Sequence, residues 1–310
     1  QPIQLPPKTT SFQNWAQQLT NYAQSEVLKS ELSYWLRESY TSVSPIPVDY
    51  NQGENTIVSA QNISVSLNET ETRSLLQDVP KAYSTQINDV LLTALVLVMS
   101  KWTNSNSVLF NLEGHGREDI IEGVDLSRTV GWFTTIFPVC VQLENTNKPN
   151  LGEVLKSVKE QLRTVPNKGI GYGLLRYLSD DRDIQSQIKN LKEAEICFNY
   201  LGQFSQLFNQ SFLLQLAKES SGNSQGLQSK RSNLLEINAI ITNDQLQINW
   251  TYSSNIHNSS TIEKIAQEFV STLQELIAHC LSPENAGFTP SDFPLVQLSQ
   301  LELDQILENL

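Results

Sequence analysis

Basic residues, histidine and cysteine are all scarce in this 310-residue sequence, and each shortage argues against a class of function. Lys and Arg together number 21 against 33 Asp and Glu, which gives a net charge of −12. Nucleic-acid binding needs clustered positive charge, so we expect no nucleic-acid partner, and we read the acidity as solubility. Metal-ligand spacings and Gly-rich phosphate-binding motifs are absent from the sequence as well.

Long hydrophobic runs are also lacking, and no apolar stretch reaches the ~18 residues of a membrane-spanning helix. We therefore expect no membrane partner. The N-terminal segment has neither the basic region nor the apolar core of a signal peptide. The three cysteines, Cys140, Cys197 and Cys280, show no paired spacing, which is typical of reduced, buried thiols in a cytoplasmic protein. Because the first residue is Gln1 and not Met, we expect an excised or processed fragment.

What the sequence does contain is a mixture of helical and strand periodicities. Apolar residues at three-and-four spacing predict helices at 11–38, 69–77, 85–102, 150–162 and 262–280, with Thr85 and Asn150 as N-caps. Strands are expected at 57–67, 107–112, 136–143 and 196–200, and a hairpin at 234–252 with its turn at Asn243-Asp244. The polar segment 179–193 should be exposed. Because strands and helices mix without a strict βαβ rhythm, the fold class is α/β or α+β.

The most informative segment follows the strand expected at 107–112. Residues 113–118 read Glu-Gly-His-Gly-Arg-Glu. Glycines allow a sharp turn or a close backbone approach, and a carboxylate, an imidazole and a guanidinium at a strand end suit acid–base chemistry. Desolvation makes a carboxylate a better base, and Glu113 lies at the mouth of an apolar strand. Taken alone, the spacing favours a strand-end carboxylate paired with Arg117 or Arg128 over a catalytic Glu113.

Four further segments complete a pattern that resembles the epimerization domains of non-ribosomal peptide synthetases, relatives of the condensation domains. They are Asn-Asp-Val-Leu-Leu-Thr-Ala-Leu at 88–95, Arg-Thr-Val-Gly-Trp-Phe-Thr-Thr-Ile-Phe-Pro at 128–138, Pro-Asn-Lys-Gly-Ile-Gly-Tyr-Gly at 166–173 and Phe-Asn-Tyr-Leu-Gly at 198–202. Any one of these motifs is a weak signal, but five in the expected order are specific. The tail at 289–295 also looks like the family's exit linker.

The resemblance implies one lobe of a two-lobed, chloramphenicol-acetyltransferase-like fold, in which a mixed sheet is flanked by helices. The expected division is an entry helix and linker at 1–50, the C-terminal lobe at 51–288 and an exit linker to the next domain at 289–310. The family's N-terminal lobe carries a His-His-x-x-x-Asp-Gly motif. That motif is absent here, because no two of the three histidines are adjacent. The sequence therefore resembles the C-terminal lobe with its entry helix.

The resemblance also implies an activity for the complete domain. Epimerization domains are isomerases that convert L- to D-aminoacyl or peptidyl thioesters by removing the Cα proton and returning one on the other face. The substrate is carried on the phosphopantetheine arm of a peptidyl carrier protein, and no cofactor is expected to bind directly. The expected partners are the carrier protein, the missing N-terminal lobe and neighbouring synthetase domains of secondary-metabolite biosynthesis. We expect the chain alone to be inactive.

By the same resemblance, Glu113 is the catalytic glutamate, opposed by a histidine of the missing lobe. Asn199 and Tyr200 line the channel as an oxyanion donor and a proton donor, although Tyr200 can also be a buried tyrosine with a satisfied hydroxyl. Residues expected to bind substrate or support the motif are His115, Arg117, Arg128, Trp132 and Tyr172.

Several of these supporting residues have a structural interpretation that we favour. His115 should be a hydrogen-bonding structural residue, and Arg117 with Glu118 should hold the loop by charge-assisted bonds. Trp132 and its neighbour Phe133 can line the tunnel for the arm or fill the core, and we favour the core. The three glycines at 169–173 should form a structural turn, since no Lys-Ser/Thr pair follows them.

Two other functions remain open. The first is a lobe of a condensation domain, which forms peptide bonds, although such domains usually differ at 113–118 and 198–202. The second is a non-catalytic module that docks a carrier protein or an adjacent domain. The absent His-His motif makes this second reading a serious description of the chain by itself. The sequence does not identify the amino acid or the final product.

Overall fold

The computed structural model describes residues 5–37, 40, 43–144, 150–203, 219, 222, 224–296 and 298–308. The chain forms two compact units that are assembled from interleaved segments. Unit 1 combines Gln1–Ser42, Asn111–Val139 and Val165–Glu193, and unit 2 combines Val43–Phe110, Cys140–Thr164 and Ala194–Leu310. Each unit therefore draws on segments that lie far apart in the sequence.

The described strands form a mixed six-stranded sheet in the order β1-β6-β5-β4-β2-β3. Their bounds are β1 (Ala60–Ser66), β2 (Ser107–Gly114), β3 (Thr135–Gln142), β4 (Ile196–Gln203), β5 (Leu235–Thr242) and β6 (Gln245–Ser253). Strands β1 and β5 run antiparallel to β6, whereas β4 runs parallel to β5. The end of β2 and the start of β3 belong to unit 1.

The hairpin predicted at 234–252 is confirmed as β5 and β6. Asn243 and Asp244 adopt left-handed φ angles of 50° and 60°, the conformation that a two-residue hairpin turn requires. Every second residue of β5 is buried, so one face of this strand points into the core. Pro138 lies in β3 at the edge of the sheet, where a missing backbone N–H is tolerated, as predicted.

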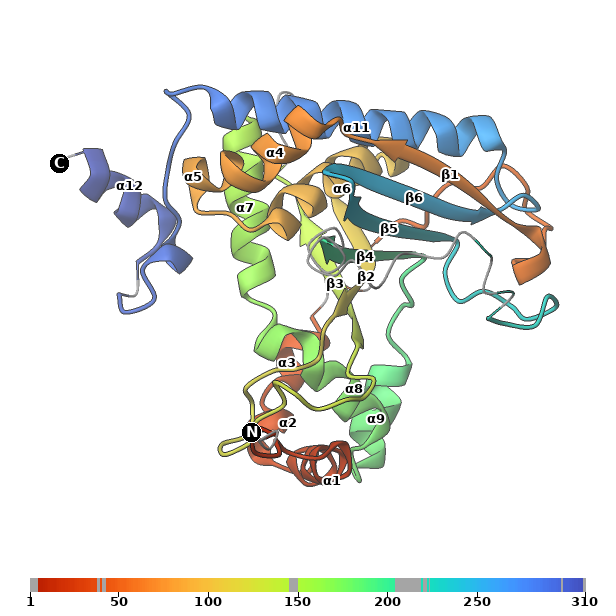
Figure 1. Cartoon of the computed structure of the whole chain (residues 1–310), viewed down its shortest axis with the longest axis vertical. Coiled ribbons are helices and arrows are strands. Elements are labelled where there is room, and N and C mark those ends of the chain that lie inside the picture. The colour runs from red at the N-terminus through yellow and green to blue at the C-terminus, as the bar shows by residue number, and fades with distance from the viewer. Residues whose placement is uncertain are drawn as a thin grey trace. The chain divides into compact units, whose positions relative to one another are not determined.

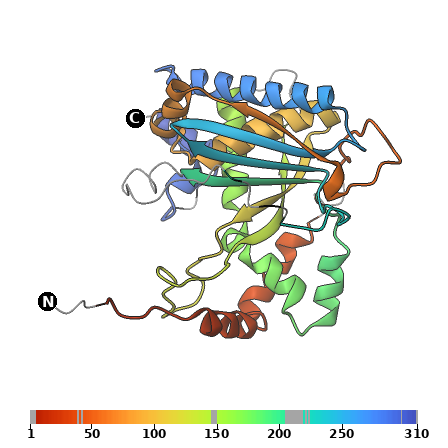
Figure 2. The same cartoon turned by 45° about the vertical axis from the view of Figure 1, so that its right-hand side comes forward.

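Helices cover the sheet of unit 2. Their bounds are η2 (Ile57–Ser59), α4 (Glu69–Gln77), α5 (Val79–Tyr83), α6 (Ile87–Thr103), α7 (Leu151–Arg163), α11 (Ser259–Leu281), η4 (Pro290–Asp292) and α12 (Gln300–Glu308). Helix α11 packs along α6 and β1, and α7 packs against α6 (Figures 1 and 2). Buried aromatic side chains fill the centre, with the rings of Trp250 and Phe269 5.6 Å apart.

No single helix in the described part of the chain is long and apolar enough to cross a membrane. One bent pair, residues 69–83 with residues 87–103, meets the length and composition test only when the two helices are taken together. Most of α6 is buried inside the unit, as expected for a core helix. Cys140, Cys197 and Cys280 are buried and reduced, as the sequence predicted.

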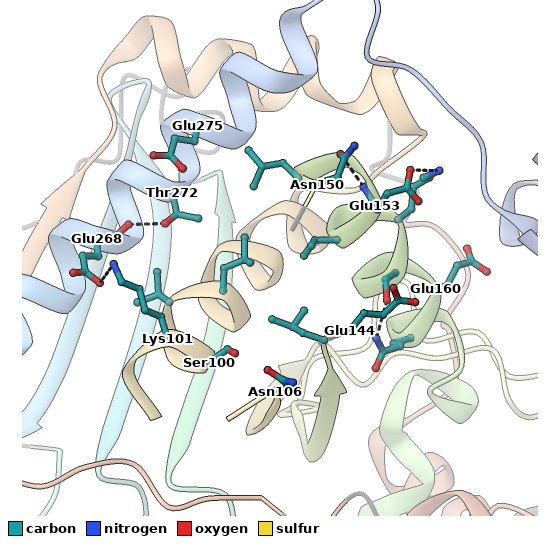
Figure 3. A pocket seen from close by; sticks show the side chains of 18 of the residues that line it. Ser100, Lys101, Asn106, Glu144, Asn150, Glu153, Glu160, Glu268, Thr272 and Glu275 are labelled. Carbon is teal, nitrogen blue, oxygen red and sulfur yellow. Dashed lines mark hydrogen bonds and ion pairs between the residues drawn. The ribbon is translucent and has the colours of Figure 1, made fainter. Parts of the chain in front are cut away.

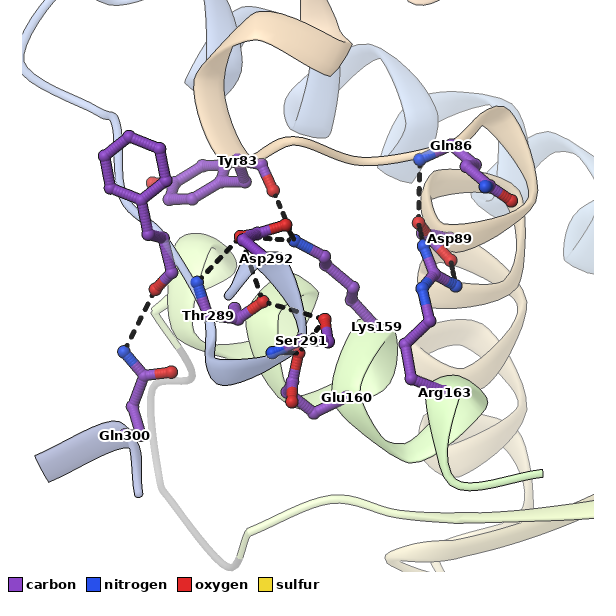
Figure 4. A network of polar contacts seen from close by, with 11 residues as sticks. Tyr83, Gln86, Asp89, Lys159, Glu160, Arg163, Thr289, Ser291, Asp292 and Gln300 are labelled. Atoms are coloured by element: carbon purple, nitrogen blue, oxygen red, sulfur yellow. Dashed lines mark hydrogen bonds and ion pairs between the residues drawn. The ribbon is translucent and has the colours of Figure 1, made fainter. Parts of the chain in front are cut away.

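The segment after α11 is anchored to unit 2 by a buried ion pair (Figure 4). The Lys159 ammonium, 1% exposed, donates to both carboxylate oxygens of Asp292 at 2.7 and 2.8 Å and to the Tyr83 carbonyl at 2.9 Å. Asp292 in turn accepts from the backbone N–H of Thr289. The start of the tail is therefore part of the fold of this unit.

Helices make up most of the regular structure of unit 1, which also contains the segment Asn111–Val139. Its helices are α1 (Phe12–Tyr22), α2 (Glu26–Lys29), α3 (Leu32–Trp35), η3 (Pro166–Gly169), α8 (Ile170–Tyr177) and α9 (Arg182–Lys189). A small core joins three of its segments through Trp15, Leu126, Phe133 and Ile170. This packing holds the loop of residues 113–134 against the first and third segments of the unit.

Three sequence predictions of local structure are wrong. The single helix expected at 11–38 is three helices, because Ser25 accepts from the Leu28 N–H and starts a new turn. Thr85 does not cap α6, whose N-cap is Gln86. The strand expected at 57–67 begins only at Ala60, because Ile57–Ser59 forms the 3-10 helix η2. The segment 179–193 is mostly exposed, as predicted, although it contains α9, which buries two isoleucines.

Candidate functional site

Glu113 lies half-buried near the end of β2, where the chain enters the 113–118 motif. A Cβ atom on the next residue, Gly114, would lie 3.1 Å from the Thr135 hydroxyl and 3.5 Å from the Phe137 ring. Gly116 has a φ of 68°, and a Cβ there would lie 1.7 Å from the Phe133 carbonyl oxygen. Gly116 is therefore needed for close approach of the two segments, whereas a side chain at Gly114 would require the Thr135 side chain to shift by a few tenths of an ångström.

His115 and Glu118 form a small polar network at the outer side of this loop. The His115 Nδ1 accepts from the Arg117 N–H at 2.9 Å, so its Nε2 carries the proton and points to the Glu118 carboxylate at 3.3 Å. Glu118 is 9% exposed and also pairs with Lys168 at 3.0 Å. The structural role expected for His115 and Glu118 is consistent with these contacts.

Arg117 ties the motif to the segment that follows it. Its guanidinium donates to the carbonyl oxygens of Leu126 and Thr129 and lies 3.9 Å from the centre of the Phe133 ring. Arg128 lies on the surface and donates to the Pro7 carbonyl at 3.3 Å. Both arginines thus hold backbone segments of unit 1 together, the loop-holding role predicted for Arg117.

Trp132 and Phe133 have opposite environments. Phe133 is 8% exposed and belongs to the core of unit 1, whereas Trp132 is 82% exposed. The expectation that both fill the core is therefore correct for Phe133 and wrong for Trp132.

A second group of side chains surrounds a buried carboxylate in unit 1. Glu31, 7% exposed, accepts from the Asn167 amide at 2.7 Å and from the Trp35 indole at 3.3 Å. Burial raises the pKa of Glu31. Tyr172 lies beside Trp35 with ring centres 5.3 Å apart, and its hydroxyl accepts from Arg176 at 2.9 Å. Tyr172 is therefore a packed residue with a satisfied hydroxyl.

Asn199 and Tyr200 lie half-buried on β4, which belongs to unit 2. They pair with Asn238 and Ala239 of β5, and the register then shifts between Tyr200 and Gln203. Such irregularities re-aim side chains and occur often beside active sites. Burial raises the pKa of the Tyr200 hydroxyl, so the phenol keeps its proton at neutral pH and is a hydrogen-bond donor there.

A cleft of about 1040 Å³ lies between α6, α7 and α11 of unit 2 (Figure 3). Glutamates dominate its polar lining, and two of them pair with Lys101 at 3.5 Å and Lys156 at 2.9 Å. None of the residues predicted to form the active site lines this cleft. Among the described residues, no group of three or more His, Cys, Asp or Glu side chains is arranged to hold a metal ion.

Glu113 and its two glycines were predicted from the sequence as parts of the site, but the contact between Glu31 and Asn167 was not. The two residues are 136 positions apart, so no local pattern connects them. One signal was available. Glu31 lies three residues after Leu28 and four before Trp35, on the apolar face expected for this helical segment. A charged residue on an apolar face is expected to have a polar partner in the fold.

Comparison with known proteins gives one family and consistent relatives. The family model for the condensation domain matches residues 1–298. A large polypeptide of the linear gramicidin synthase of Brevibacillus parabrevis is 48% identical over 309 residues, which cover 99% of this chain and 4% of that protein. The chain therefore spans only a small part of the curated relatives that it matches.

Two solved structures show the same fold. The epimerization domain from the third module of tyrocidine synthetase B is 37% identical, with a TM-score of 0.82 over 90% of this chain and 62% of that one. A cyclization–docking bidomain of a non-ribosomal peptide synthetase from Sorangium cellulosum is 16% identical, with a TM-score of 0.60 over 89% of this chain and 54% of that one. These matches confirm the expected chloramphenicol-acetyltransferase-like fold with its mixed sheet flanked by helices.

Proposed function

The chain belongs to the condensation-domain family of non-ribosomal peptide synthetases, and from this premise we propose that it is part of an epimerization domain. The substrate is an aminoacyl or peptidyl thioester carried on the phosphopantetheine arm of a peptidyl carrier protein. The observation that carries the proposal is the similarity to a solved epimerization domain, which far exceeds the similarity to the cyclization domain. Glu113 and its glycine-framed motif supply the chemistry.

In the proposed reaction Glu113 removes the Cα proton. The C–H bond breaks, the electron pair moves into the enolate, and the thioester oxygen takes up the negative charge. A proton donor on the opposite face of the enolate then gives its proton to Cα. Glu113 releases its proton to solvent and the donor takes one up from solvent, so the proton count balances. Asn199 is proposed to donate to the enolate oxygen, and the protonated Tyr200 hydroxyl to donate a hydrogen bond or a proton.

A condensation activity is the second candidate, because the matching family model describes condensation domains. In that reaction an amine attacks a thioester carbonyl, and no Cα–H bond is broken. The two activities therefore differ in one atom that can be followed directly, the hydrogen on Cα. An experiment in D₂O distinguishes them without knowledge of the natural product.

The proposal is tested with the synthetase domain that contains this chain and an aminoacyl-loaded carrier protein in D₂O. We expect deuterium at Cα and accumulation of the D-epimer with the wild type. Glu113→Gln should lower the exchange rate by at least ~10²-fold, the usual contribution of a general base. Glu122→Gln is the matched control, because Glu122 is an exposed carboxylate in the same loop. Exchange at the wild-type rate in Glu113→Gln would remove Glu113 from the mechanism.

A further inference from the structure

Unit 1 contains three consecutive residues in the left-handed region of backbone conformation. Asn167, Lys168 and Gly169 have φ angles of 43°, 51° and 85°. Side chains disfavour this region, and two of the three residues are not glycine. Such a turn persists only where its surroundings determine it, and it is common near functional sites. The contacts that hold it should therefore be specific.

Two carboxylates from distant segments hold this turn by its side chains. Glu31, on the connection between α2 and α3, accepts from the Asn167 amide at 2.7 Å. Glu118, in the 113–118 motif, pairs with the Lys168 ammonium at 3.0 Å. The two anchors differ in burial, because Glu31 is 7% exposed whereas the Lys168 side chain is 75% exposed. The buried bond to Glu31 is therefore the stronger constraint, since solvent does not compete for it.

The second carboxylate oxygen of Glu31 also accepts a hydrogen bond, and neighbouring groups pack closely around the carboxylate. The Trp35 indole N–H donates to this oxygen at 3.3 Å. A Cβ atom on Gly171 of α8 would lie 2.0 Å from it, so a side chain there would force the carboxylate to move. The carboxylate is thus enclosed by neutral groups of α3, η3 and α8. A buried carboxylate in such surroundings is retained only where its bonds are all made.

The turn 167–169 also lies beside Gly114, the residue that follows Glu113. The Lys168 carbonyl oxygen lies 3.9 Å from the Cβ position of Gly114. The Phe137 ring closes the same space, because it lies 3.5 Å from that position and within 2.2 Å of the Cβ position of Gly169. Gly114 and Gly169 therefore face the same Phe137 ring, and a shift of the turn would reach the 113–118 motif through this ring and through the Lys168–Glu118 pair. Such a shift would change the direction of the Glu113 side chain.

From this geometry we propose that Glu31 is a positioning residue for Glu113. It fixes the left-handed turn 167–169, and the turn fixes the start of the 113–118 motif. The inference rests on the proposed function of Glu113 for its catalytic consequence. Its structural half, the coupling of Glu31 to residues 113–118, stands independently and is measured separately.

The structural half is tested on the chain as it is, by hydrogen–deuterium exchange of backbone amides. Glu31→Ala should raise the exchange of amides in both 166–170 and 113–118. Glu26→Gln, which changes an exposed carboxylate of the neighbouring helix, should leave both segments unchanged. Faster exchange confined to 166–170 would overturn the proposed coupling, whatever the chemistry of Glu113 turns out to be.

The catalytic half is tested in the synthetase domain that contains this chain, by Cα deuterium exchange at saturating carrier protein. Glu31→Ala should lower the rate by about 10- to 10²-fold, the scale expected when a reacting group is displaced by about an ångström. The carrier concentration for half-saturation should not change, because the substituted Glu31 is buried inside unit 1. Glu31→Gln should recover part of the rate, since its amide oxygen still accepts one of the two bonds.

A milder variant keeps the test decisive if Glu31→Ala fails to fold. Asn167→Gly removes the amide that bonds Glu31 but favours the left-handed backbone, so the fold should be retained. It should also lower the Cα exchange rate, but by a smaller factor than Glu31→Ala. A wild-type rate in Asn167→Gly and Glu31→Gln, together with a large loss in Glu113→Gln, would overturn the positioning role. A wild-type rate in all three would refute the proposed function and leave the amide-exchange result to decide the coupling.

Discussion

Loss of the Asp292 carboxylate should destabilise unit 2 far more than loss of an exposed ion pair. Lys159 is 1% exposed, and within the described part of the chain its contacts at hydrogen-bond distance are to Asp292 and the Tyr83 carbonyl (Figure 4). Asp292→Ala removes two of these three acceptors and leaves a buried ammonium group with one. It also removes the acceptor for the Thr289 N–H.

The size of the effect follows from the burial of the charge that remains. Breaking a buried pair by removing one partner costs about 3–5 kcal/mol, because the other charge stays desolvated. For a chain of this size each kcal/mol corresponds to about 2–4 °C in melting temperature, so the expected decrease is about 6–20 °C. Glu268→Ala is the matched control, because it also removes the acidic partner of a lysine, but Lys101 is 74% exposed. An exposed pair contributes about 0–1 kcal/mol.

Urea unfolding of the purified chain, followed by circular dichroism, measures both variants against the wild type. A third variant separates buried charge from lost packing. Lys159→Met combined with Asp292→Ala removes both charges and should recover most of the stability that Asp292→Ala alone has lost. Equal and small decreases in the free energy of unfolding for Asp292→Ala and Glu268→Ala would contradict the expected cost of leaving a buried charge unpaired. So would a double variant less stable than Asp292→Ala.

Three further predictions follow from burial. The three cysteines should not react with a thiol reagent in the folded chain at pH 8 and should all react in denaturant. All three are buried, and burial raises the pKa of Cys280 to about 11. Rapid labelling of the native chain would contradict their burial. Trp132→Phe should remove most of the fluorescence that acrylamide quenches, because Trp132 is 82% exposed whereas Trp15, Trp35 and Trp250 are buried; unchanged quenching would place that ring inside the fold. Because burial raises the pKa of Glu31, the folded state binds more protons than the unfolded state between the ordinary glutamate value of about 4.3 and the raised folded value. The free energy of unfolding of the wild type should therefore fall relative to Glu31→Gln as pH rises through that window, and a change of the opposite sign in paired urea titrations would contradict the burial argument.

Local signals predicted the elements whose information lies within one segment. Helix α4 occupies the expected residues 69–77, because Asn68 accepts from the Glu71 N–H and Glu71 accepts in return, a complete capping box. The β5–β6 hairpin needed only two alternating runs around Asn243-Asp244. The single helix expected at 11–38 was wrong because the apolar spacing continues past the end of α1 at Tyr22, while Ser25 caps the start of a new helix.

The candidate site was predictable to the extent that one motif encodes it. The two glycines of 113–118 marked a close backbone approach, and the structure shows which atoms would clash with a side chain there. The exposure of Trp132 was within reach of the sequence, since Phe133 competes for the core from the opposite side of the chain. The Glu31–Asn167 contact was not, because only the tertiary fold brings these residues together.

The measurement that tests the central claim most directly follows the Cα hydrogen when both reactions are possible. The synthetase domain that contains this chain is given an aminoacyl-loaded carrier protein and a second loaded carrier as acceptor, in D₂O. Mass spectrometry and chiral analysis then report deuterium, configuration and peptide bonds in one sample. We expect α-deuterium with accumulation of the D-epimer and no new peptide bond. A dipeptidyl product without α-deuterium would contradict this expectation and assign the chain to the condensation reaction.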